Sequence, residues 1–163
     1  MGAFHAYSAA ITWTGAGETG TSSYTAYSRE HTVLVEGKAD ILGSADPAFR
    51  GDSSRHNPEE LFVASLAQCH MLWFLHMAAQ AGVVVTEYTD HAVGTMRVEA
   101  AGAGQFTEVE LRPRVVLAEG TAGDPETLVA GLHARAHDHC FIARSVNFPV
   151  RISPIVAAHA PVA

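Results

Sequence analysis

The sequence predicts an α+β fold in which two helices share one side of antiparallel sheets. Residues 7–14 and 27–36 are short apolar runs that end in turn-forming residues, a pattern typical of a β-hairpin. Residues 61–81 contain neither proline nor glycine and indicate a long helix. Strand-like segments return after this helix and enclose a second helix. This order of strands, helix, strands, helix and strand is the basis of the α+β assignment.

Residues with strong capping preferences mark both ends of the long helix. Asn57 suits the N-cap, Pro58 suits the first helical position, and Glu60 stands where the carboxylate of a capping box belongs. Gly82 favours termination. Because apolar residues occur on every face of the intervening segment, we expect the helix to be buried nearly all round.

The C-terminal half predicts an alternating strand, a second helix and a last strand. Residues 108–115 alternate polar with apolar side chains, and Pro113 makes this an edge strand or a bulge. The second helix should begin after Asp124 and stop near Cys140. Its apolar stripe consists of Leu128, Val129, Leu132 and Ala136. Residues 147–153 predict the last strand, and the Ala-rich tail after it is expected to fray.

Composition and charge exclude several classes of partner. A chain of 163 residues suits one domain, residues 1–163. Its net charge of -7 repels phosphate backbones and anionic membranes, so neither nucleic acid nor a membrane surface is expected as a partner. The first residues lack the pattern of a signal peptide, and the apolar run 61–79 contains polar residues, so we expect a cytoplasmic protein without a membrane span. A hydrophobic content of 48% favours a homodimer.

The two cysteines, Cys69 and Cys140, are the main candidates for chemistry. Structural disulfides are rare in the cytoplasm, which leaves redox chemistry, metal binding or packing. A reactive thiol must ionise, and Cys69 lies too far along its helix for the helix dipole to help, so a cation is needed. The candidates are Arg29, Arg50 and Arg55 for the cation, and Glu59 or Glu60 for the carboxylate that orients it.

The start of the long helix resembles a motif of the OsmC/Ohr family, the osmotically inducible protein C and organic hydroperoxide resistance proteins. Asn57, Pro58 and Glu59 open the helix, and Cys69 follows Asn57 by 12 positions. The second cysteine of the motif corresponds to Cys140, 71 positions after Cys69. The sequence departs from the family where a proline usually follows that cysteine, because Phe141 stands there.

This resemblance implies a cofactor-free thiol peroxidase that reduces organic hydroperoxides to alcohols. It implies an OsmC-like, intertwined homodimer in which antiparallel sheets wrap two long central helices. By the same resemblance Cys69 is the peroxidatic thiolate, Cys140 the resolving thiol and Glu59 the carboxylate that orients an arginine. Arg50 matches the OsmC branch and Arg29 the Ohr branch. The implied reductant is a dithiol, such as a lipoylated protein.

Helix geometry adds a condition to this expectation. Ten residues separate Glu59 from Cys69, about 15 Å along a helix axis, so the two cannot meet within one chain. A shared site would therefore take its glutamate from the partner subunit. Apolar walls near Cys69 would favour alkyl or lipid hydroperoxides over hydrogen peroxide. The expected wall residues are Leu66, Trp73, Phe74 and Phe141.

Two other functions stay open. His133, His137 and His139 cluster next to Cys140, with His70 beside Cys69. His133 and His137 share a helical face, as metal ligands often do. The chain has no paired-cysteine or HExxH pattern, so exposed, solvated histidines are the simpler interpretation. Alternatively, the chain is a non-catalytic protein that binds an apolar small molecule at the dimer cleft, with both cysteines serving only as packing.

Overall fold

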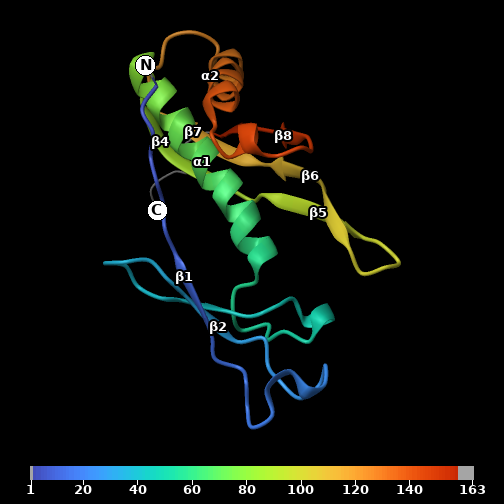
Figure 1. Cartoon of the computed structure of the whole chain (residues 1–163). Helices are drawn as coiled ribbons and strands as arrows, with labels where there is room; N and C mark the ends of the chain where they lie inside the picture. Colours follow the sequence, from blue (N-terminus) through green and yellow to red (C-terminus); the bar gives the residue numbers. More distant parts are fainter. Residues whose placement is uncertain (1, 158–163) are drawn as a thin grey trace, which may run out of the picture. The chain divides into compact units, whose positions relative to one another are not determined.

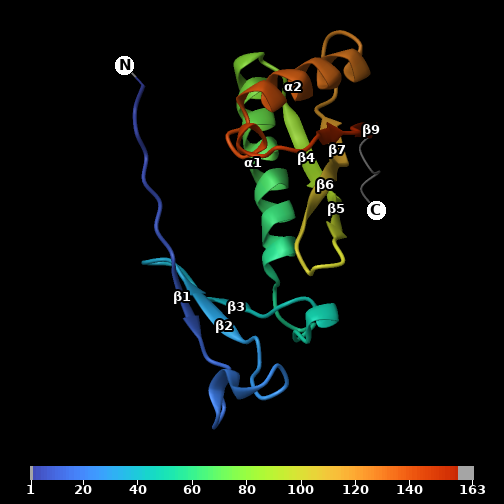
Figure 2. The ribbon, with the colours of Figure 1, turned by 45° about the vertical axis from the view of Figure 1, so that its right-hand side comes forward.

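The computed structural model describes residues 2–157, which divide into two compact units. The first unit runs to Leu61 and the second begins at Phe62. The elements of each unit can be followed in Figures 1 and 2. The fold is α+β, as predicted, with two α-helices and several small sheets among the described residues. That residues 1–163 form a single domain stays a prediction.

The first unit is built on an antiparallel sheet of three short strands. These are β1 (Ala10–Trp13), β2 (His31–Leu34) and β3 (Ile41–Gly43), in the order β1-β2-β3. Thr12 pairs with Thr32, which in turn pairs with Leu42. The Trp13 indole N–H donates to the Ser28 carbonyl at 2.8 Å and ties the long β1–β2 connection back to the sheet. The predicted hairpin is thus confirmed.

A reciprocal capping box starts helix α1 (Pro58–Gln80). The Glu60 N–H donates to Asn57 Oδ1 at 2.8 Å, and the Asn57 N–H donates to Glu60 Oε2 at 3.2 Å. Two of the N–H groups that a helix start leaves unpaired are thereby satisfied. At the other end Gly82 adopts a φ of 69°, a conformation that costs glycine least. Both predicted ends of the helix are confirmed.

Only one stripe of α1 is buried in the single chain. The buried residues repeat at helical spacing: Leu66, His70, Phe74, Met77 and Ala78. Apolar side chains also occupy the other faces, but Leu72, for example, is 61% exposed. The expectation of burial nearly all round is therefore wrong for the isolated chain, because the chain's own elements cover one face only.

The second unit contains two mixed sheets. The first has the order β4-β7-β9, and the second has the order β5-β6-β8. Their strands are β4 (Val85–Asp90), β5 (Val93–Val98), β6 (Gly104–Leu111), β7 (Pro113–Leu117), β8 (Val150–Ile152) and β9 (Ile155–Ala157). Pairing is antiparallel between β4 and β7 and between β5 and β6, whereas β8 and β9 add in parallel to β6 and β7. The sequence predicted antiparallel sheets. The sheets of the second unit are instead mixed, because β8 and β9 pair in parallel.

The strand predicted over residues 108–115 is in fact two strands. Arg112 separates β6 from β7, and the two belong to different sheets. Pro113 is the first residue of β7, where a missing N–H is tolerated, but β7 is the central strand of its sheet. The edge-strand prediction was wrong for this reason. Strand β9 was not predicted at all, and residues 158–163 of the tail expected to fray lie outside the described residues.

Helix α2 (Pro125–His139) packs with α1 on the β4-β7-β9 sheet, as Figure 2 illustrates. Asp124 caps it by accepting the Thr127 N–H at 2.8 Å, and Cys140 is its C-cap, both as predicted. Phe74 of α1, Leu132 of α2 and Val115 of β7 belong to one core cluster. Leu66, nearer the start of α1, joins β6 and β8 in a second cluster. One helix therefore serves both sheets of this unit.

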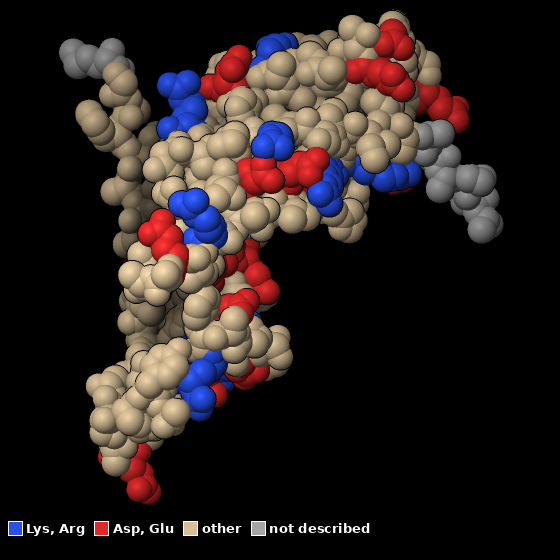
Figure 3. All heavy atoms as spheres, turned by 90° about the vertical axis from the view of Figure 1, so that its right-hand side faces the viewer, with Lys and Arg blue, Asp and Glu red and all other residues tan. Residues whose placement is uncertain are grey.

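Charges on the outer face of the β5-β6-β8 sheet are locally paired. Arg112 donates to Glu110 at 2.7 Å, and Arg151 pairs with Glu108. On the face shown in Figure 3, basic side chains lie beside acidic ones rather than forming a basic stripe. This surface offers no continuous positive path to a nucleic acid backbone.

Among the described residues, α1 is the one helix whose length and composition would allow it to cross a membrane, with a mean hydropathy of 1.4 in its most apolar window. Its buried stripe packs on strands and on α2 of the same chain. The core helix of a water-soluble fold has the same composition, so these properties alone do not indicate a membrane span.

Candidate functional site

Cys69 and Cys140 form a pair of free thiols in the second unit. Cys69 lies mid-way along α1 and is partly accessible, whereas Cys140 ends α2 and is fully buried. The two side chains are close enough for Cys69 to raise the pKa of Cys140 through a hydrogen bond and through charge. The structure thus brings together two residues that are 71 positions apart in the sequence. We refer to Cys69 and Cys140 as the thiol pair.

The two thiols have different environments. Burial raises the pKa of Cys140 to about 11, and the neighbouring Cys69 adds to this effect. The Ala143 N–H, which donates to Cys140 Sγ at 3.5 Å, lowers the pKa in part. Cys140 is therefore protonated at neutral pH and shielded from solvent. A thiol in that state is a poor first nucleophile but a suitable proton-bearing partner for one. Cys69 is the one of the two that a substrate can reach from solvent, and it has the protonated Cys140 beside it.

Phe141 does not prevent the thiol pair from forming. The chain turns directly after Cys140 into a short 3-10 helix, Ala143–Ser145, and the Arg144 N–H donates to the Cys140 carbonyl at 3.0 Å. This turn holds Cys140 beside Cys69 without a proline at position 141. The turn after Cys140 therefore forms with phenylalanine at position 141.

An aromatic rim surrounds Trp73, one turn beyond Cys69 on α1. The ring of Trp73 contacts three others, with centroid distances of 5.1 Å to His139, 5.4 Å to Phe141 and 5.6 Å to His76. Phe141 is 66% exposed and available to an apolar ligand. Leu66 and Phe74 were also expected to line the site, but both are fully buried in the core clusters. Their part of that expectation was wrong, because they face inward on the buried stripe of α1.

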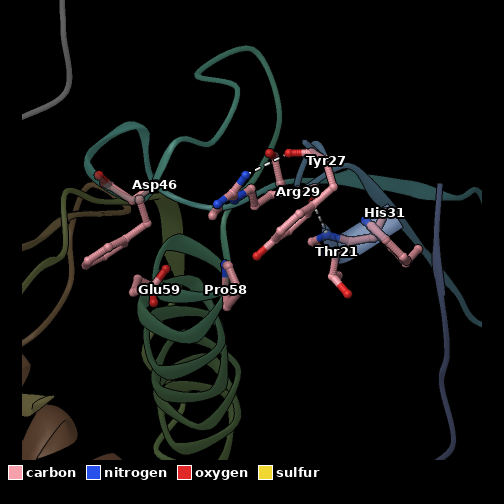
Figure 4. Close-up of a pocket in the computed structure, with 11 residues that line it drawn as sticks. Thr21, Tyr27, Arg29, His31, Asp46, Pro58 and Glu59 are labelled. Atoms are coloured by element: carbon pink, nitrogen blue, oxygen red, sulfur yellow. Dashed lines mark hydrogen bonds between the residues drawn. The ribbon is translucent and has the colours of Figure 1, made fainter. Parts of the chain in front are cut away.

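The first unit contains a pocket of about 440 Å³ that includes two of the candidate catalytic residues (Figure 4). Arg29 enters it from the segment before β2, and Glu59 from the first turn of α1. The full lining consists of Trp13, Thr21, Tyr27, Arg29, His31, Ser44, Ala45, Asp46, Phe49, Pro58 and Glu59. Because Glu60 is engaged in the capping box, Glu59 is the acidic residue of that helix start left to face the pocket.

Arg29 is held by neutral groups. Its guanidinium donates to the Tyr27 carbonyl at 2.7 Å and to the Tyr24 carbonyl at 2.9 Å. Its central carbon lies 4.3 Å from the ring centroid of Tyr24 and 4.2 Å from that of Tyr27, so both rings stabilise the cation. A guanidinium has five N–H donors, so this arrangement leaves others for a ligand.

The other two candidate arginines are placed differently. Arg50 is not among the residues that line the pocket, and it adopts a left-handed backbone conformation with a φ of 65° at the end of a short 3-10 helix. Arg55 forms ion pairs with Glu30 at 3.5 Å and Asp52 at 3.6 Å. Arg29 is thus the arginine that the structure places in one pocket with Glu59.

The histidine cluster is not what the sequence suggested. His133 is 2% exposed and His70 is 1% exposed, so the expectation of solvated histidines was wrong for these two. His70 Nε2 and His133 Nδ1 are 2.8 Å apart and share a hydrogen bond. No group of three or more His, Cys, Asp or Glu side chains among the described residues is arranged to hold a metal ion. We refer to His70 and His133 as the imidazole pair.

Burial keeps the imidazole pair neutral. It lowers the pKa of His70 to about 4, with His137 adding to the effect, and lowers the pKa of His133 to about 3, with His70 adding to the effect. The spacing of these two histidines along their helices indicates that they are buried. His70 sits four residues from Leu66 and from Phe74 on the buried stripe, and His133 adjoins Leu132 on the stripe of α2.

The fold and the thiol pair define a small α+β thiol protein, and comparison with known proteins agrees. A family model described as OsmC-like protein matches residues 51–154. The chain therefore belongs to the OsmC-like family. No curated protein matches it significantly.

Solved structures show the same fold. An OsmC-like protein of unknown function from Vibrio cholerae is 37% identical, with a TM-score of 0.83 over 93% of this chain and 100% of that one. An organic hydroperoxide resistance protein from Elizabethkingia anophelis is 19% identical, with a TM-score of 0.67 over 95% and 99% of the two chains. The organic hydroperoxide resistance protein OhrB of Bacillus subtilis is 19% identical, with a TM-score of 0.60 over 93% and 98%.

The imidazole pair makes stability depend on pH. An unfolded histidine has a pKa near 6.5, so between about pH 6.5 and pH 4 the unfolded chain binds more protons than the native chain. The free energy of unfolding should therefore fall as the pH drops through this window, by roughly 2–4 kcal/mol between pH 7.5 and pH 5. Urea titrations at fixed protein concentration would measure it. The double variant His70→Leu/His133→Leu should lose this part of the dependence, and an unchanged slope in that variant would contradict the assignment.

Proposed function

We propose that the chain is a thiol-dependent peroxidase that reduces organic hydroperoxides to alcohols. The observation that carries this proposal is the thiol pair, an accessible Cys69 beside a buried, protonated Cys140. Two family relatives named as organic hydroperoxide resistance proteins have the same fold and support it.

In the first step the Cys69 thiolate attacks the distal oxygen of the hydroperoxide. An S–O bond forms, the O–O bond breaks, and the leaving alkoxide takes up a proton from water to become the alcohol. Sulfur is oxidised to a sulfenic acid while the peroxide is reduced by two electrons. A guanidinium stays charged when it is desolvated and has several donors, so Arg29 is suited to stabilise both the thiolate and the peroxide oxygen.

In the second step Cys140 condenses with the sulfenic acid. The S–S bond forms, the S–O bond breaks, and the oxygen leaves as water with the proton that Cys140 had retained. An external dithiol then reduces the disulfide by exchange. A lipoylated protein has the required chemistry, and the exposed Phe141 of the aromatic rim offers an apolar contact near the thiol pair for it or for the tail of a substrate.

The proposed active unit is a homodimer. Glu59 and Cys69 lie ten residues apart on one continuous helix, about 15 Å along its axis, so one chain cannot bring them together. The exposed apolar faces of α1, including Leu72, provide surface for a second copy to cover. In this arrangement the Arg29 pocket of one subunit closes over the thiol pair of the other.

Replacing the arginines separates the two candidates. Arg29→Ala should lower kcat/KM for cumene hydroperoxide about 100-fold, because the reacting oxygens lose a charged donor. Arg50→Ala should change it less than threefold, since Arg50 is outside the pocket that contains Glu59. Steady-state assays with a dithiol reductant give both values. The reverse order of effects would transfer the role to Arg50.

Intact-mass analysis after one equivalent of an organic hydroperoxide tests the chemistry directly. Loss of two hydrogens is expected, because Cys140 lies beside Cys69 and should resolve the sulfenic acid. The variant Cys140→Ser should instead gain one oxygen at Cys69. An unchanged mass in the wild-type protein would refute the peroxidase proposal and favour a non-catalytic protein that binds an apolar molecule.

Mixed dimers test the contribution of the partner subunit. Cys69→Ser and Glu59→Ala chains should each be inactive alone, whereas a mixture should regain one working site per heterodimer, up to about a quarter of wild-type activity with random pairing. Differently tagged chains, purified in tandem, would prove that mixing occurred. A proven heterodimer without activity would contradict a shared site.

A further inference from the structure

The imidazole pair is a hydrogen bond within a largely apolar contact between α1 and α2. Around it, α1 and α2 meet through Phe74, Val129, Leu132 and Ala136. Apolar contacts are non-directional and tolerate small slides of one helix along another. A hydrogen bond has a narrow range of length and angle, so it fixes the register of the two helices.

The geometry of this hydrogen bond is close to ideal. The ring centroids are 5.1 Å apart and the ring planes differ by only 8°. That separation equals the 2.8 Å N···N distance plus the two ring radii, so the imidazoles meet edge to edge in nearly one plane rather than face to face. The face of His133 rests instead on Phe74, at 4.2 Å between centroids. Phe74 thus restrains the ring of His133, and the hydrogen bond restrains the ring of His70.

The imidazole pair is directly linked to the thiol pair through the two helices. His70 follows Cys69 on α1, and consecutive helical residues point about 100° apart, so one faces the core while the other faces Cys140. His133 precedes Cys140 by seven residues, about two turns of α2. A slide of α1 relative to α2 would therefore displace one sulfur from the other.

We propose that the hydrogen bond between His70 and His133 positions Cys69 and Cys140 for disulfide formation by fixing the register of α1 against α2. Disulfides require Cα separations within a window of roughly 2 Å, which is comparable to a modest helix slide. The two histidines are positioning residues, because they act through the helices and do not touch the reacting sulfurs. This inference rests on the proposed pairing of the cysteines, but not on reactivity toward peroxides.

Burying two polar rings costs free energy of folding, so the pair is better explained by a positioning role than by a gain in stability. The outer nitrogens, His70 Nδ1 and His133 Nε2, have no hydrogen-bond partner among residues 2–157. Buried orphan nitrogens destabilise a core, and leucines of similar volume would avoid this cost. A pair of leucines would fill the space but would not define a register.

The redox equilibrium of the thiol pair with dithiothreitol provides a test that needs no hydroperoxide. Oxidised dithiothreitol accepts two electrons and two protons from the cysteines, and the Cys69–Cys140 disulfide and reduced dithiothreitol are formed. The equilibrium constant is obtained from alkylation and mass analysis over a series of redox ratios. In the variant His70→Leu/His133→Leu the equilibrium constant for disulfide formation should fall about fivefold, which corresponds to the typical net contribution of one hydrogen bond. The variant should remain folded, because both polar partners are replaced together.

Two further variants make the result specific. His133→Asn places an amide where Nδ1 stood and should retain the wild-type constant to within twofold. Val129→Ala opens a cavity in the same interface without removing a hydrogen bond, and should lower stability while leaving the constant unchanged. The inference is overturned if the double leucine variant matches the wild type, if Val129→Ala lowers the constant as much, or if the wild-type thiol pair forms no disulfide. Inertness toward hydroperoxides with these redox results intact would defeat only the peroxidase proposal.

Discussion

The second unit depends on how one helix divides its faces. Along α1 a single stripe is buried, and its members contact two sheets and a second helix. Because side chains one position apart diverge by about 100°, burying His70 in this stripe leaves Cys69 at its border, where it can reach both Cys140 and solvent. The capping box at Asn57 fixes where the helix starts, and packing against the two sheets and α2 determines which of its residues are buried.

The difference between the two cysteines follows from burial. Cys140 is enclosed and keeps its proton, whereas Cys69 is partly accessible to solvent. The two thiols can therefore take different roles in one reaction. Local backbone produces this difference: Cys140 ends a helix and starts a tight turn that buries its sulfur. The first unit is organised differently, around a cation held by carbonyls and tyrosine rings.

The helices and their caps could be predicted because they depend on local sequence. Asn57 and Asp124 accept hydrogen bonds from backbone N–H groups three residues further along the chain. Gly82 ends its helix through its own backbone conformation. The errors concern partners remote in sequence. Pro113 becomes central only because β9 pairs with β7, and β9 is too short to give a periodic pattern. Leu66 and Phe74 look like any apolar residue near Cys69 until the stripe of α1 is known.

The candidate site was predictable in the same uneven way. The motif that starts at Asn57 and the second cysteine segment named Cys69, Glu59 and Cys140 as candidates, and their catalytic roles stay predictions. It could not choose between Arg29 and Arg50, because that choice depends on which of two loops faces Glu59. The imidazole pair escaped prediction because histidine is found both on surfaces and in cores. Its place on the apolar stripes of α1 and α2 was the available signal, but which ring pairs with which depends on tertiary packing.

The single residue between β6 and β7 has a mechanical consequence. Arg112 is the only spacer between two strands that belong to different sheets, and its N–H donates to Asp90 at 2.8 Å, which closes the gap in hydrogen bonding. With no slack in this connection, separating one sheet from α1 must strain the other. The two sheets of the second unit should therefore open as one cooperative foldon instead of fraying strand by strand.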